Sequence, residues 1–79
     1  MKQIINGLLY DTDKATLIST IVIYGGKRRD YYKTDKGNYF CHYAYNGELR
    51  VVSESEIKKI LAKYDVEAYI HLFGSVKEG

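Results

Sequence analysis

Cys41 and His42 are the first residues of this sequence whose types suggest covalent chemistry, because a thiol and an imidazole can serve as a nucleophile and its base. Both lie in an aromatic, apolar stretch that is typical of a β-strand. Neighbouring side chains on a strand point to opposite faces, so this pair cannot form a catalytic dyad. We interpret Cys41 as a small buried apolar residue, which is the usual role of a free cysteine.

The sequence also lacks the motifs of a metal site and of a phosphate-binding loop. The chain has one cysteine and two histidines, His42 and His71, and their positions lack the spacing of a metal site. The segment Gly25-Gly26-Lys27 lacks the second glycine and the Gly-Lys-Ser/Thr ending of a phosphate-binding loop. We therefore expect a protein without enzymatic activity, metal or cofactor.

Length and composition predict a single domain over residues 1–79. One cysteine excludes a disulfide framework within the chain and suits a reducing compartment. The first ten residues lack the pattern of a secretory signal, and the longest apolar run, Ile21 to Tyr24, is far shorter than a membrane span requires. We expect a cytoplasmic protein that does not bind membranes.

The turn signals predict β-hairpins. Asn6-Gly7 and Asn46-Gly47 suit two-residue loops whose central positions need positive φ, and Asp35-Lys36-Gly37 suits a three-residue loop. Ser19 to Tyr24 is β-branched and apolar and predicts a buried strand, which Gly25-Gly26 ends. Residues 66 to 73 predict a closing strand, because two sets of side chains alternate along them. The apolar set is Val66, Ala68, Ile70 and Leu72, and the set between them is Glu67, Tyr69, His71 and Phe73.

Two helices are predicted, a short one near the start of the chain and a longer one near its end. Asp11 can cap the first, which would reach about Leu17. Ser53 and Glu56 form a capping box before the second. Its apolar stripe follows helical spacing and consists of Ile57, Ile60, Leu61 and Tyr64. The predicted fold is α+β: an antiparallel sheet of hairpins with one main helix on one face.

The two central turns predict a strand register and therefore two sheet faces. Tyr32, Phe40, Ala44, Leu49 and Val51 share one face, with Asp30 opposite His42 as a structural pair. We assign this mostly apolar face to the core beneath the main helix. The other face interleaves tyrosines with cations and comprises Arg29, Tyr31, Lys33, Tyr39, Cys41, Tyr43, Tyr45, Glu48, Arg50 and Val52.

That tyrosine-rich face has two interpretations. Tyrosine favours strands, and cross-strand Tyr–Arg and Tyr–Lys pairs stabilise a sheet by about 0.2–1 kcal/mol each, so the face can be purely structural. Aromatic and arginine side chains are also what recognition surfaces favour. The basic run Lys27-Arg28-Arg29 lies beside it, and residues 27 to 36 carry a local net charge of +3 within a chain of +2. The run can equally be a solvated loop that protects a strand edge.

Several segments resemble small proteins of bacterial phages and mobile elements. Those proteins begin with an Ile-Ile-Asn-Gly hairpin followed by Tyr-Asp-Thr, which here are Ile4 to Gly7 and Tyr10 to Thr12. They continue with a Tyr-x-Thr-x-x-Gly-Asn-Tyr-Phe hairpin, here Tyr32 to Phe40, and a late helix opened by Ser-Glu, here Ser53 and Glu54. Several members of that group are anti-CRISPR proteins or candidates for that role. The resemblance implies a non-enzymatic inhibitor that docks on a CRISPR effector.

The leading hypothesis is therefore a cytoplasmic inhibitor, from a phage or mobile element, of a bacterial defence protein or ribonucleoprotein. Its predicted partner-binding residues are Lys27, Arg28, Arg29, Tyr31, Lys33, Tyr39, Tyr43, Tyr45 and Arg50. A second hypothesis is a nucleic-acid-binding module, in which bases stack on the rings and phosphates contact the cations. A third is a subunit that forms a homodimer through its sheet face or edge.

Overall fold

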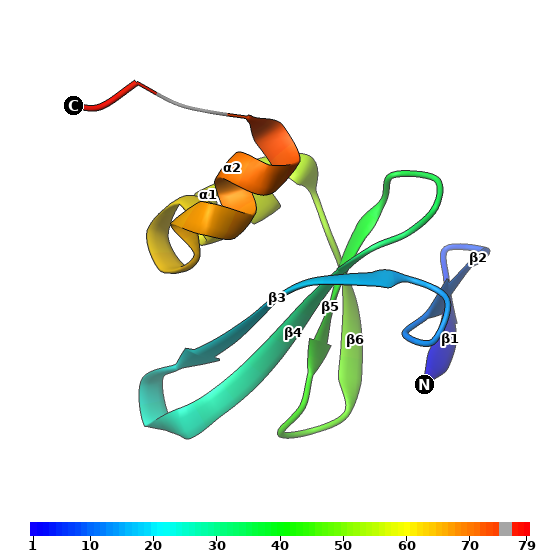
Figure 1. Cartoon of the computed structure of the whole chain (residues 1–79). Coiled ribbons are helices and arrows are strands. Elements are labelled where there is room, and N and C mark those ends of the chain that lie inside the picture. Colours follow the sequence, from blue (N-terminus) through cyan, green and yellow to red (C-terminus); the bar gives the residue numbers. More distant parts are fainter. Residues whose placement is uncertain (75–76) are drawn as a thin grey trace.

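The computed structural model describes residues 1–74 and 77–79. Six strands precede two helices along the chain (Figure 1). The strands are β1 (Lys2–Ile5), β2 (Leu8–Asp11), β3 (Thr16–Ile23), β4 (Lys27–Lys33), β5 (Tyr39–Tyr43) and β6 (Glu48–Val52), with the 3₁₀ turn η1 (Tyr24–Gly26) between β3 and β4. The helices are α1 (Glu54–Tyr64) and α2 (Val66–Phe73). The predicted α+β class is confirmed.

The strands form two antiparallel sheets. β1 and β2 make a separate hairpin, and the other four strands form a meander in the order β3-β4-β5-β6. Figure 1 shows the helix pair and the β1–β2 hairpin on different sides of the meander. Only neighbouring strands pair in the meander, so short local turns set its topology.

The predicted pairing of β4 with β5 is confirmed residue by residue, from Arg29 opposite Tyr43 to Lys33 opposite Tyr39. The connecting turn explains this register. Thr34 N–H donates to the Asn38 carbonyl at 2.8 Å, and Gly37 has a φ of 85°, which suits glycine because it has no Cβ. A three-residue loop with glycine in the left-handed position therefore forms as expected.

The predicted two-residue loop at Asn46-Gly47 is wrong. Residues 44 to 47 form a four-residue loop, and Tyr43 lies opposite Glu48 rather than Arg50. The Asn46 side chain accepts a hydrogen bond from the Glu48 N–H at 2.9 Å, which stabilises the wider turn. The partner of each β5 residue shifts by two positions, so every side chain keeps its predicted face.

The short helix predicted after Asp11 is also absent. Residues 12 to 15 make a turn in which the Asp11 carboxylate accepts the Asp13 N–H at 2.9 Å. The carboxylate thus binds a free N–H group as expected of a cap, but Thr16 begins β3 immediately afterwards. β-Branched residues favour this strand over a further helical turn.

The C-terminal half contains two helices where one helix and one strand are predicted. Ser53 caps α1 as expected, since its Oγ accepts the Glu56 N–H at 3.1 Å. The prediction of a closing strand over residues 66 to 73 is wrong, because these residues form the helix α2. Asp65 caps this helix by accepting the Ala68 N–H at 3.2 Å. The side chains that α2 packs against the core follow helical spacing and are Ala68, Tyr69, Leu72 and Phe73.

Two buried clusters lie on opposite faces of the meander. The larger comprises Ile21, Tyr31, Tyr39, Cys41, Val52, Ile57 and Leu61, and it joins the sheet to α1 and α2. The smaller comprises Tyr10, Phe40 and Leu49, and it joins the sheet to the β1–β2 hairpin. The Tyr10 and Phe40 rings meet edge to face with centroids 5.4 Å apart, a favourable aromatic geometry.

Asp65 ties α2 to the sheet, which makes it the residue to test. Its second carboxylate oxygen accepts a hydrogen bond from the buried Ser19 hydroxyl of β3 at 2.6 Å. Asp65→Ala removes the helix cap and leaves that hydroxyl unpaired, so we expect it to lower the free energy of unfolding by about 2 kcal/mol. Urea denaturation measures this loss.

Glu67→Ala is the matched control, because Glu67 is an exposed acid in the first turn of the same helix. We expect it to change stability by no more than about 0.5 kcal/mol. Equal effects of the two substitutions would contradict a structural role for the Asp65–Ser19 hydrogen bond.

Candidate functional site

The two sheet faces are assigned the wrong way round in the sequence prediction. The tyrosine-rich face lies beneath α1 and α2, and Tyr31 and Tyr39 are only 2% and 6% exposed there. The face assigned to the main helix instead packs Phe40 against the β1–β2 hairpin. Tyr31 and Tyr39 are therefore core residues and offer no ring to a partner in this structure.

Part of the predicted surface remains accessible where the sheet extends beyond the helices. Figure 1 shows the β3–β4 turn and the β5–β6 loop at the end of the meander away from α1 and α2. Five predicted residues meet there, and we call them the cation–tyrosine patch: Lys27, Arg29, Tyr43, Tyr45 and Arg50. The structure thus brings together five of the nine predicted residues.

The patch is a ladder of rings and cations. The Tyr43 and Tyr45 rings stack with centroids 5.9 Å apart. The Lys27 ammonium lies 5.0 Å from the Tyr45 centroid, and the Arg29 guanidinium carbon lies 4.9 Å from the Tyr43 centroid. Arg50 lies 5.8 Å from the same Tyr43 ring. These distances are within the range of cation–π attraction, which holds the rings and charges in a defined arrangement.

Arg29 is the most constrained cation of the patch. A polar contact with the Tyr31 side chain is the main cause of a raised pKa at Arg29. Like any arginine, Arg29 is charged at physiological pH. The buried Nε atom has no hydrogen-bond partner within residues 1–74 and 77–79. A buried donor without an acceptor costs free energy in the folded protein. A partner cannot reach this buried Nε atom, so Arg29 contributes to the patch through the charge of its guanidinium and its contact with the Tyr43 ring.

Glu48 belongs to the surroundings of this patch, although it is not among the predicted partner-binding residues. Its Oε1 lies 3.3 Å from Arg50 Nε, and its Oε2 accepts a hydrogen bond from the Asn46 amide at 3.4 Å. The spacing Glu48-x-Arg50 signals this contact, because residues two apart on a strand share a face. One carboxylate beside three cations leaves the patch with a net positive charge.

Arg28 and Lys33 lie apart from the patch. Arg28 belongs to the opposite sheet face, where its Nε lies 3.4 Å from Asp30 Oδ1. Lys33 lies at the far end of β4, with its ammonium 5.8 Å from the Tyr39 centroid. Adjacent residues of a strand alternate between faces, so the run Lys27-Arg28-Arg29 cannot act as one basic surface.

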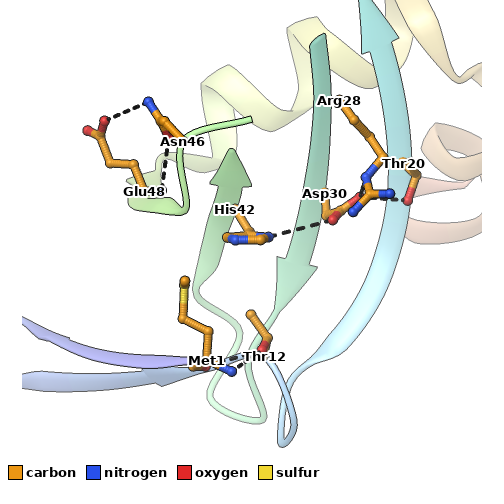
Figure 2. A network of polar contacts seen from close by, with 8 residues as sticks. All are labelled: Met1, Thr12, Thr20, Arg28, Asp30, His42, Asn46 and Glu48. Atoms are coloured by element: carbon orange, nitrogen blue, oxygen red, sulfur yellow. Dashed lines mark hydrogen bonds and ion pairs between the residues drawn. The ribbon is translucent and has the colours of Figure 1, made fainter. Parts of the chain in front are cut away.

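Asp30 is the centre of a polar network on the hairpin side of the sheet (Figure 2). The carboxylate is buried, accepts the Thr20 hydroxyl at 3.0 Å and lies 3.7 Å from His42 Nδ1. The predicted pairing of Asp30 with His42 is confirmed. These partners satisfy a carboxylate that would otherwise be costly to bury, which is a structural role.

Cys41 is buried at 1% exposure, as predicted, between the sheet and the helices. Burial raises the pKa of its thiol from 9.0 to about 12. At neutral pH the thiol is therefore protonated, and nucleophilic chemistry requires a thiolate. Within the described residues, no group of three or more His, Cys, Asp and Glu side chains is arranged to hold a metal ion.

Comparison with protein-family models, curated proteins and solved structures finds no match to this chain. None of the helices in the described part of the chain is long and apolar enough to cross a membrane.

The buried thiol predicts a loss of stability at alkaline pH. The unfolded chain releases the Cys41 proton above about pH 9, whereas the folded chain keeps it until about pH 12. The unfolded state then binds fewer protons, so the free energy of unfolding falls by up to about 1.4 kcal/mol per pH unit. Burial also raises the pKa of Tyr31, which adds to the fall above about pH 10. Urea denaturation between about pH 8 and pH 10.5 measures this slope.

Cys41→Ala is the control for this prediction, because alanine cannot titrate. The variant is expected to be less stable at every pH, since its smaller side chain leaves a cavity. Its stability should nevertheless depend less steeply on pH near pH 9.5 than that of the unmodified protein. Identical slopes for the two proteins would show that the thiol does not titrate differently in the folded state.

Proposed function

We propose that this protein is a non-enzymatic binding protein that recognises an acidic surface of a partner through the cation–tyrosine patch. The observation that carries the proposal is the accessible ladder of two stacked tyrosines and three cations. Tyrosine and arginine are enriched among the residues that dominate binding energy at interfaces. Their mutual contacts order these side chains before binding, which reduces the entropy lost on association.

The charge of the patch indicates the chemistry of the partner. Lys27, Arg29 and Arg50 outnumber the one neighbouring carboxylate, Glu48, so an acidic surface is attracted and a basic one is repelled. The exposed guanidinium of Arg50 can donate to a carboxylate of the partner. Tyr45, at 47% exposure, supplies apolar area at the accessible end of the ladder.

The resemblance to anti-CRISPR proteins supports the biological setting of this proposal. It concerns the first hairpin, the β4–β5 hairpin and the start of α1, all of which help to build the fold. In this setting the partner is a CRISPR effector complex of a bacterial host, and the protein acts in the host cytoplasm. A small binding protein can inhibit such a complex by occupying a surface that the complex needs.

A second candidate function is the binding of single-stranded nucleic acid by the same patch. The stacked Tyr43 and Tyr45 rings favour it, because bases stack on such rings while phosphates contact neighbouring cations. This candidate predicts a steep loss of affinity as the salt concentration rises, since bound cations are released from the nucleic acid. Pull-down from bacterial lysate, with and without nuclease treatment, separates the two functions.

Substitution of Tyr43→Ala together with Arg50→Ala tests the proposal. The double variant removes the central ring and one of the cations that contact it, so we expect affinity for the captured partner to fall about 100-fold. Thermal unfolding of the same preparation must show that the variant remains folded. Unfolding of the variant would favour a purely structural role for these side chains.

Lys63→Ala together with Tyr64→Ala is the matched control. Lys63 lies 5.2 Å from the Tyr64 ring centroid, so this pair is also an exposed cation–π contact, but it is on α1. The control variant should bind the partner as tightly as the unmodified protein does. Equal loss of binding in both double variants would contradict recognition through the cation–tyrosine patch.

A further inference from the structure

The outer edge of β3 is a second surface of the molecule with a specific chemistry. β3 is an end strand of the meander, so one side of its backbone pairs with β4 and the other side faces away. Its eight residues, TLISTIVI, include no charged residue and no proline. Charges and prolines are the usual devices that prevent an edge strand from pairing with another chain.

Hydrogen bonds elsewhere in the sheet show which backbone groups point outward from β3. The Arg28 carbonyl accepts a hydrogen bond from Ala44 N–H at 3.1 Å, so the backbone polar groups of Arg28 face β5. Arg28 therefore makes no backbone hydrogen bond with its β3 partner. In an antiparallel ladder, the two residues of such a non-hydrogen-bonded pair direct their N–H and C=O groups away from each other. Val22 lies opposite Arg28, so its polar groups face outward, as do those of Thr20 two residues earlier.

These positions make the edge complementary to itself. Thr20 and Val22 lie on either side of Ile21. A twofold axis midway between the Ile21 residues of two copies therefore places Thr20 of each copy opposite Val22 of the other, which makes two such pairs. Each of these pairs can exchange two N–H···O=C hydrogen bonds, which gives four in total. We propose that two copies of this chain pair antiparallel through β3 in this register and form a continuous eight-stranded sheet.

The side chains at this edge fit the proposal. Val22 is 63% exposed, and Thr20 beside it is also exposed, so pairing brings β-branched side chains of the two copies together. The regular part of the edge begins at Ser19, because a bulge between Leu17 and Ser19 interrupts the ladder. The other end strand, β6, carries Glu48 and Arg50, which oppose pairing at that edge.

Sedimentation of the full chain across concentrations between about 1 µM and 1 mM tests the proposal. The expected result is a reversible shift from the 9.1 kDa monomer to a dimer of twice that mass. Val22→Pro is expected to abolish the dimer while the monomer remains folded, because this N–H serves only the outer edge. Val22→Thr retains the N–H and the branched shape, and it should dimerise like the unmodified protein.

Val22→Lys provides a second variant in case proline disturbs the monomer. Val22 is 63% exposed, and a charged side chain on an edge strand opposes pairing with another chain, so the variant should be monomeric. A monomer of the unmodified protein at about 1 mM would overturn the proposal. Dimers of a folded Val22→Pro variant, or of the Val22→Lys variant, would also overturn it.

Discussion

Burial of β5 on both of its faces is the constraint on which the rest of this structure depends. Phe40 and Cys41 are neighbours on this strand, point to opposite faces, and are 0% and 1% exposed. A chain of 79 residues must therefore supply two covers for one sheet, and it uses the α1–α2 pair on one face and the β1–β2 hairpin on the other. Neither cover is large, which leaves part of each sheet face accessible.

This constraint explains why tyrosine is so frequent. A tyrosine ring adds apolar area to a thin core while its hydroxyl can remain near solvent or a polar neighbour. Tyr31 and Tyr39 lie where the helices cover the sheet, and Tyr43 and Tyr45 lie towards the end that the helices leave accessible. The same residue type thus serves the core at one end of the sheet and forms the cation–tyrosine patch at the other.

Much of the local structure could be predicted from the sequence, and much of the candidate site could not. The β4–β5 register and the Ser53 cap depend on a few neighbouring residues, so their signals are complete in the sequence. The segment from Val66 to Phe73 satisfies both a strand pattern and a helix pattern, and Asp65 decides between them by capping α2 and bonding Ser19. That last contact joins residues 46 positions apart, which no local pattern reveals.

By itself, the sequence determined the α+β class and the order of the central hairpins. It also determined the face to which each β4 and β5 side chain points, because turn chemistry and strand alternation are local. Only the tertiary structure decided which cover lies on which face, since both faces are apolar enough to be buried. That choice places Tyr31 and Tyr39 in the core and leaves Tyr43 and Tyr45 with their cations in the patch. It depends on packing between segments distant in sequence, which local patterns do not reveal.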